Sequence, residues 1–139
     1  MLRSWTIRAL LLIAMAAGAA ACDDEAPVTP TTPAPAVTET FSGDVTQNGA
    51  QTHNFATAAS GVVTATLKEV APDSGLVIGF SLGNWTGTSC QIVLANDAAT
   101  GGAILTGTMS GIGNLCLRIY DVGNVPAAGA SYRVEVVHP

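Results

Sequence analysis

Apolar and polar residues alternate along most of the chain after residue 40. The clearest case is the segment 61–70, where apolar residues occupy every second position: Val63, Ala65 and Leu67 alternate with Thr64, Thr66 and Lys68. Such alternation predicts an antiparallel strand with one face in the core and one face in water. Beyond the first 22 residues, no apolar repeat follows the helical period.

Other segments of similar length have the same strand-like character. They cover residues 40–45, 51–57, 75–83, 89–96, 103–111, 113–123 and 131–137. The segment 75–83 is nearly all apolar, which predicts a central position in a sheet. Turn residues separate the segments, as at Asn48-Gly49 and at 71–75, where Pro72 would preset φ and Gly75 would take a positive φ. We expect 113–123 and 131–137 to form a closing hairpin.

About eight short strands at spacings of 8 to 15 residues predict an all-β fold. The expected architecture is an antiparallel β-sandwich or jelly roll formed by residues 41–139, because a parallel α/β fold would need helical segments between the strands. Roughly 100 residues suffice for one small domain with its own core.

The first 22 residues have the pattern of an export signal. Arg3 and Arg8 precede an apolar run over 9–21, which ends at Cys22. The run is shorter than the roughly 20 apolar residues of a membrane-spanning helix, so a signal peptide explains it better. The sequence Ala19-Ala20-Ala21-Cys22 resembles the lipobox of bacterial lipoproteins, although Ala19 replaces the usual Leu. The resemblance implies a lipid on Cys22 and a membrane anchor in the bacterial cell envelope. In the alternative, an ordinary signal peptide is cleaved after Ala21 and leaves a free cysteine.

Residues 23–40 are expected to form a disordered linker. They contain four of the seven prolines in the chain, together with threonine and alanine. This composition favours an extended spacer, which could hold the domain up to roughly 50 Å from a membrane.

The two remaining cysteines, Cys90 and Cys116, are expected to form a disulfide. In an exported protein an even number of cysteines favours a bridge. A metal or redox pair is the weaker alternative, because the two cysteines do not form a CxxC motif. Cys116 shares a strand face with Arg118 and Tyr120, and Cys90 shares one with Ile92 and Leu94. The bridge therefore requires a β-bulge or a position near a strand end.

The sequence contains no motif of a known catalytic site. We expect a protein that is not an enzyme and that needs no metal or other cofactor. His53 lies on an apolar strand face, where a histidine usually packs. The aspartates near predicted turns are expected to accept backbone N–H groups, with calcium binding at one end as the alternative: they are Asp44, Asp73, Asp97 and Asp121.

Trp85, in the loop 84–88, is the strongest candidate for ligand binding, with Asn84 beside it. An aromatic residue among Gly, Asn and Thr can stack on a sugar or anchor a protein partner. In the alternative, Trp85 folds back over the edge of the core.

Several segments together resemble the bacterial pre-peptidase C-terminal (PPC) domain. They are THNF at 52–55, GVVTATL at 61–67, and the closing Arg118-Ile119-Tyr120-Asp121 with the later Tyr132-x-Val-x-Val. That family consists of small exported β-sandwiches. The resemblance implies a non-catalytic accessory module, with roles in secretion, surface targeting or the binding of carbohydrate or protein. Many members have an acidic strand in the middle, whereas residues 75–83 have no carboxylate, which argues against a calcium site there.

The charge of the domain excludes one class of partner. Residues 41–139 carry three basic and six acidic side chains, a net charge of −3. Such a surface lacks the basic patch of a nucleic-acid-binding protein. The expected partners are therefore a membrane, through the lipid, and a glycan or an envelope protein. An accessory domain of a secreted hydrolase system is the alternative.

Overall fold

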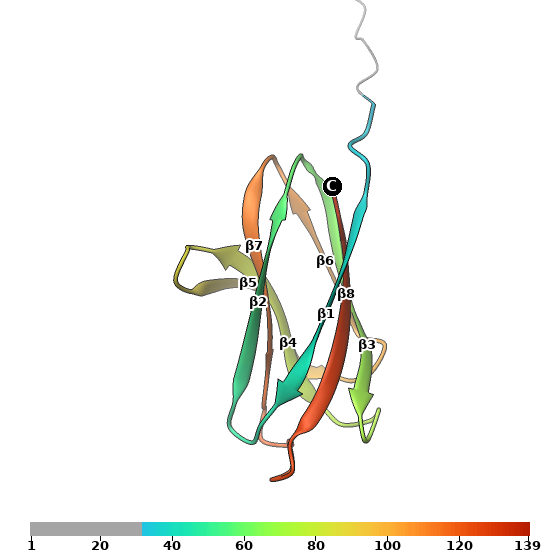
Figure 1. Ribbon diagram of the computed structural model, residues 1–139, viewed down its shortest axis with the longest axis vertical. Helices are drawn as coiled ribbons and strands as arrows, with labels where there is room; N and C mark the ends of the chain where they lie inside the picture. The colour runs from blue at the N-terminus through green and yellow to red at the C-terminus, as the bar shows by residue number, and fades with distance from the viewer. Residues whose placement is uncertain (1–31) are drawn as a thin grey trace, which may run out of the picture. The chain divides into compact units, whose positions relative to one another are not determined.

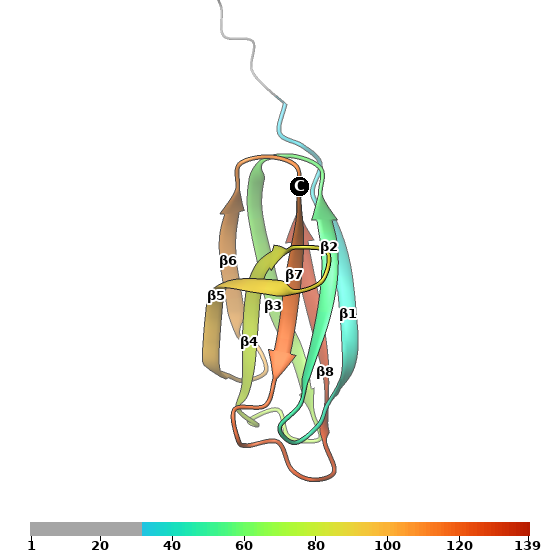
Figure 2. The ribbon, with the colours of Figure 1, turned by 90° about the vertical axis from the view of Figure 1, so that its left-hand side faces the viewer.

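The computed structural model describes residues 32–139, which form a β-sandwich (Figures 1 and 2). Two antiparallel four-stranded sheets pack against each other, as the sequence predicted. The strands are β1 (Val37–Val45), β2 (Ala50–Thr57), β3 (Gly61–Ala71), β4 (Ile78–Trp85), β5 (Cys90–Ala99), β6 (Ile104–Met109), β7 (Gly113–Tyr120) and β8 (Ala130–His138). The predicted signal peptide, Cys22 and most of the predicted linker lie outside the described residues. β1 begins at Val37, within the stretch assigned to the linker.

The connectivity is that of a jelly roll. The strand order is β1-β8-β3-β6 in sheet A and β2-β7-β4-β5 in sheet B. The first strand therefore pairs with the last, β1 with β8, and the following pairs are β2 with β7, β3 with β6 and β4 with β5. This pairing order is that of a jelly roll. Within residues 32–139, β4 and β5 are the only consecutive strands that pair with each other. Every other connection crosses from one sheet to the other.

The prediction that the last two strands form a closing hairpin is wrong. β7 lies in sheet B between β2 and β4, and β8 lies in sheet A between β1 and β3. The connection between them, residues 121–129, is long enough to cross the roughly 10 Å between packed sheets. Each strand thereby gains a partner on both sides. The expected central position of the apolar segment 75–83 is confirmed, since β4 lies between β7 and β5.

The core lies between the sheets and follows the alternation of the sequence. Along β3, Val63, Ala65 and Leu67 are buried and Lys68 is exposed, as predicted. The opposing sheet contributes four large, fully buried side chains: Ile78, Phe80, Leu117 and Ile119. These apolar side chains leave water together, and their burial supplies the main driving force for folding.

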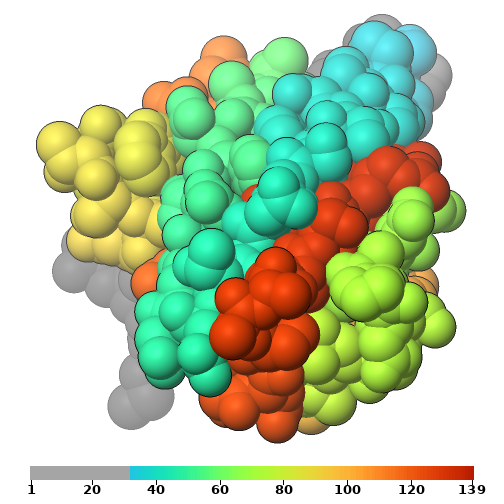
Figure 3. Space-filling view, turned by 60° about the horizontal axis from the view of Figure 1, so that its bottom comes forward, coloured from blue at the N-terminus to red at the C-terminus, as the bar shows by residue number. Residues whose placement is uncertain are grey.

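The β1–β2 turn and the β7–β8 loop lie at the lower end in Figure 1, and the Asp121 carboxylate joins them. Oδ1 accepts the N–H groups of Gly123 (2.7 Å), Asn124 (2.9 Å) and Val125 (2.9 Å), and Oδ2 accepts that of Asn48 (2.8 Å). These hydrogen bonds lower the pKa of Asp121 to about 2, because they favour the charged form. Figure 3 shows the β1–β2 turn beside the red-orange start of β8. The expected role of accepting backbone N–H groups is confirmed for Asp121, whereas Asp97 accepts the Tyr120 hydroxyl instead.

The turn between β3 and β4 differs in part from its prediction. The Ala71–Pro72 peptide bond is cis, and Gly75 is not among the glycines with positive φ. Asp73 Oδ1 accepts the N–H of Gly75 at 2.9 Å, which confirms the expected role of that aspartate. Hydrogen bonding by Asp73 therefore shapes the turn without a left-handed residue at position 75.

Candidate functional site on the β4–β5 hairpin

The β4–β5 hairpin carries both residues predicted to bind a ligand. Its turn is closed by hydrogen bonds between Thr86 and Ser89: Thr86 N–H donates to Ser89 O (3.0 Å), and Ser89 N–H donates to Thr86 Oγ1 (3.2 Å). Gly87 has a φ of 95°, in the left-handed region that favours glycine. The hairpin is therefore a defined structure, whereas the sequence predicted a break over 84–88.

The end of the hairpin leaves the plane of sheet B and folds over its outer face. It projects from the sandwich in Figure 1 and crosses in front of β7 in Figure 2. A register shift between Leu82 and Gly83 marks the bend. A Cβ atom at Gly83 would lie 2.1 Å from Gln91 O, so only glycine allows the strands to approach this closely.

The predicted disulfide between Cys90 and Cys116 holds the hairpin in this position. In sheet B, β4 lies between β5 and β7, so a flat sheet would separate the two cysteines by about two strand spacings, roughly 10 Å. The observed distance between the Cα atoms is 5.7 Å. The sequence predicted either a bulge or a position near a strand end, and both are present: the shift at Gly83 is a bulge, and Cys90 is the first residue of β5.

Trp85 and Asn84 lie where the hairpin bends. Trp85 is the last residue of β4 and pairs with Cys90, while Asn84 is exposed. Trp85 is half-buried, but among residues 32–139 it belongs neither to the buried core nor to the apolar side chains packed against it. The hairpin thus holds an indole beside a free amide, and both side chains have surface open to solvent.

Next to the hairpin, the outer face of sheet B presents polar side chains. Cys116 lies beneath the hairpin, and Arg118 follows on the same face of β7. The neighbouring strand places Asn54 opposite Cys116 and Thr52 opposite Arg118. All three polar residues are exposed. The sequence had placed Arg118 on the face of Cys116, and the pairing of β2 with β7 brings Thr52 and Asn54 beside them.

Tyr120 and Asp97 form the lower part of this face. The Tyr120 hydroxyl donates a hydrogen bond to Asp97 Oδ1, and the ring lies against Gly79, where a Cβ would come within 2.1 Å of it. Desolvation and the bond to Asp97 raise the pKa of Tyr120 to about 12. The Arg118 guanidinium lies 5.5 Å from the ring centroid, a cation–π distance. These contacts fix the position of Arg118.

The seam between β1 and β2 is closed by aromatic side chains. His53 stacks on Phe41 at 5.1 Å between centroids, and its Nε2 lies 2.8 Å from the Tyr132 hydroxyl. Burial lowers the pKa of His53. Farther along, Phe55 packs against His138 at 5.3 Å. The expectation that His53 is a packed histidine is confirmed.

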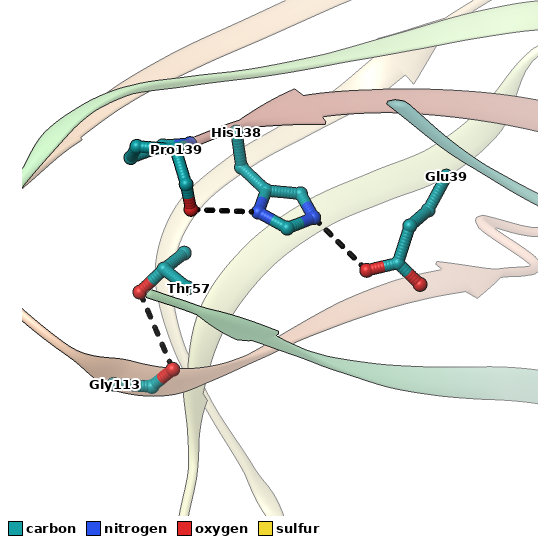
Figure 4. Close-up of polar contacts among 5 residues, drawn as sticks. All are labelled: Glu39, Thr57, Gly113, His138 and Pro139. Atoms are coloured by element: carbon teal, nitrogen blue, oxygen red, sulfur yellow. Dashed lines mark hydrogen bonds and ion pairs between the residues drawn. The ribbon is translucent and has the colours of Figure 1, made fainter. Parts of the chain in front are cut away.

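The polar atoms around this seam have partners. His138 Nε2 lies 2.9 Å from Glu39 Oε1, and its Nδ1 lies 3.2 Å from Pro139 O. The Thr57 hydroxyl donates to Gly113 O at 3.3 Å (Figure 4). Among the described residues, no buried side-chain nitrogen or oxygen lacks a hydrogen-bond partner. The cluster is therefore explained by packing alone.

The opposite seam, between β5 and β6, contains a groove of about 330 Å³. Its lining is mainly apolar: Val63, Leu82, Leu94, Met109 and Leu115. Asn84 also lines the groove, so one of the predicted ligand residues lies between the groove and the hairpin. The volume is at the lower end of the range of small-molecule sites, about 300–1,000 Å³.

Within residues 32–139, no group of three or more His, Cys, Asp or Glu side chains is placed to hold a metal ion. The same part of the chain contains no helix with the length and apolar character needed to cross a membrane. Neither a scan against protein-family models nor a search of curated proteins returned a match. The function is therefore inferred from the sequence and from the geometry described above.

Proposed function

We propose that the chain is a non-catalytic lipoprotein of the bacterial cell envelope, anchored through Cys22, whose PPC-like β-sandwich binds a glycan or an envelope protein. The lipobox-like sequence at 19–22 and the proline-rich stretch that follows it support the anchor. The Cys90–Cys116 bridge supports export, because disulfides persist in oxidising compartments.

The observation that carries the binding function is the hairpin held over sheet B. Its disulfide joins Cys90, the pairing partner of Trp85, to Cys116, which lies on the same face of β7 as Arg118, before any ligand arrives. Such preorganisation reduces the entropy lost on binding. The bridge therefore holds the bent hairpin, and with it the tryptophan, in place.

The chemistry of this surface favours a glycan over a strongly charged ligand. A sugar offers an apolar ring face for the indole and hydroxyl groups for hydrogen bonds. Thr52 and Asn54 are uncharged side chains that both donate and accept hydrogen bonds. Arg118 adds donors only, which would suit the oxygen atoms of a sugar.

A glycan array probed with the purified protein tests the binding function. We expect a family of glycans to bind, and Trp85→Ala to weaken binding at least about tenfold, as for an aromatic anchor. Thr38→Ala, on the outer face of the other sheet, is the matched control and should bind like the wild type. A flat array, or equal binding by the two variants, would contradict glycan binding at this hairpin.

Metabolic labelling with a fatty acid tests the anchor separately. We expect label in the full-length protein and none in Cys22→Ser, which should also leave the membrane fraction. An unlabelled wild-type protein would overturn the anchor and would leave the binding experiment unaffected.

A further inference from the structure

β6 differs from the other edge strands in its side chains. The two sheets end at β1 and β6 and at β2 and β5. Titratable or disulfide-forming residues occur on three of these strands: Glu39 and Asp44 on β1, His53 on β2, and Cys90 and Asp97 on β5. β6, with the sequence ILTGTM, has none, and its pairing with β3 shows no register shift. Natural sheet edges are usually protected by charge, proline or bulges, and β6 has none of these.

Exposed apolar side chains gather around this strand. Six large apolar residues are exposed within 32–139, and only Val37 is on the opposite edge. The other five lie on β5, on β6, on the neighbouring strand β3 and in the β6–β7 turn: Val62, Ile92, Val93, Ile104 and Ile112, of which Ile112 is 86% exposed. Val93 lines the groove, whereas Val62 and Ile104 lie on the outer face of sheet A, so exposed apolar side chains flank β6 on both faces.

We propose that β6 pairs antiparallel with β6 of a second copy of this chain, about a twofold axis at Thr106. Directly opposed residues in a sheet share a face, so the outward residues of one strand must oppose those of the other. On β6 the outward residues have even numbers and the groove-facing residues have odd numbers. The twofold axis must therefore lie at a residue, which then opposes its own copy. An axis between two residues would place an outward residue opposite a groove-facing one.

The side chains select the position of the axis. With the axis at Thr106, the register places Leu105 opposite Gly107 of the second copy and Met109 opposite Ala103, so each large groove-side residue meets a small one. With the axis at Gly107, Leu105 would meet Met109, and glycine would meet glycine. Of these two registers, the first lets the inner faces interlock without crowding at one point and a void at another.

Charge also favours a second copy as the occupant. Two identical acidic domains repel each other wherever their carboxylates meet. Self-pairing through β1 would bring Glu39 and Asp44 near their own copies, whereas β6 carries no charge to repel. An isologous interface of this kind closes as a dimer and leaves no free edge on either β6. The proposal does not depend on the proposed glycan binding or on the anchor.

Cysteine cross-linking of the full-length protein in producing cells tests the register. Directly opposed residues in an antiparallel pair have Cα atoms about 4.5–5.5 Å apart, within the range of a disulfide. We expect Thr106→Cys to give a covalent dimer on a non-reducing gel. Thr40→Cys, exposed on the outer face of the opposite edge strand, is the matched control and should remain monomeric. A monomeric Thr106→Cys protein, or equal cross-linking of both variants, would overturn the proposal.

A charge placed on the axis gives a second test without a cross-link. In a dimer, Thr106→Lys opposes its own copy, and like charges directly opposite destabilise a strand pair. We expect the dissociation constant measured by analytical ultracentrifugation to rise about two- to fivefold or more relative to Thr40→Lys. Both residues are exposed threonines on edge strands of sheet A, so both variants should fold. Monomers only in the wild-type protein, or the same constant for both variants, would contradict the dimer.

Discussion

The two seams of the sandwich are closed in different ways. Between β1 and β2, Phe41, His53, Phe55 and Tyr132 fill the space and are linked by stacking and a hydrogen bond. Between β5 and β6, aliphatic side chains leave a groove with exposed Ile and Val around it. Packing and polar contacts thus make the first seam part of the stable core, while the second keeps apolar surface available. The first seam therefore maintains the fold, and the second is the side on which the proposed pairing with a second copy would occur.

The largest expected effect is the loss of an aromatic ring from the closed seam. Phe55 is 5% exposed and contacts Phe41 and His138, so Phe55→Ala should lower the free energy of unfolding by about 3–5 kcal/mol. Leu94→Ala, on the open groove, should cost less than about 2 kcal/mol, because water and neighbouring side chains can fill the space. Denaturant titration measures both values, and equal costs would remove the distinction between the seams.

The disulfide should have the next largest effect. The double variant Cys90→Ser, Cys116→Ser opens a loop of 26 residues, which is expected to cost about 3 kcal/mol. The loss should be accompanied by faster amide exchange in the hairpin and not in β1 or β2. A variant as stable as the wild type, with unchanged exchange, would show that strand pairing alone holds the hairpin.

The closed seam should also give the stability a dependence on pH. Burial lowers the pKa of His53 below its ordinary value of 6.5, so the unfolded chain takes up a proton more readily than the folded one. Its contribution is therefore fully present above about pH 6.5 and is lost as the pH falls toward the folded-state pKa. His53→Gln should flatten this part of the stability profile, whereas Thr52→Gln should not. A slope that persists in His53→Gln would assign it to another group.

The smallest expected effect is a gain in stability at the open groove. A methyl group at Gly107 would lie 3.3 Å from the Leu94 Cδ1 atom, the end of a side chain beside free space. Gly107→Ala should therefore raise the free energy of unfolding by about 0.5 kcal/mol, through reduced entropy of the unfolded chain. Gly83→Ala, where the methyl meets backbone at 2.1 Å, should instead lose about 1–3 kcal/mol. The same sign for both would contradict the described packing.

Local patterns in the sequence predicted much of this fold. The alternation of Val63, Ala65 and Leu67 identified β3 and its buried face, and the apolar segment 75–83 identified a central strand. The cysteine count predicted the disulfide, and the strand faces predicted the bulge that it requires. The buried face of a strand depends on residues that are close in sequence, and the disulfide depends on the oxidation state of the cysteines. Neither requires knowledge of which strands pair.

Features that depend on strand pairing could not be predicted in the same way. The sequence suggested a hairpin of the last two strands because they are adjacent, but a jelly roll pairs strands that are far apart in sequence. For the same reason it did not show that Arg118 would lie beside Thr52, or that β6 would end a sheet. Trp85 was recognised from its local composition, while the bend that positions it depends on contact between Gly83 and Gln91.

Amide hydrogen exchange at increasing protein concentration tests most directly the claim that the two sides have different roles. We predict that peptides covering residues 104–109 become more protected as concentration rises, while those covering 37–45 and 50–57 stay unchanged. Protection that is independent of concentration over 104–109, or that increases over 37–57 instead, would contradict the account.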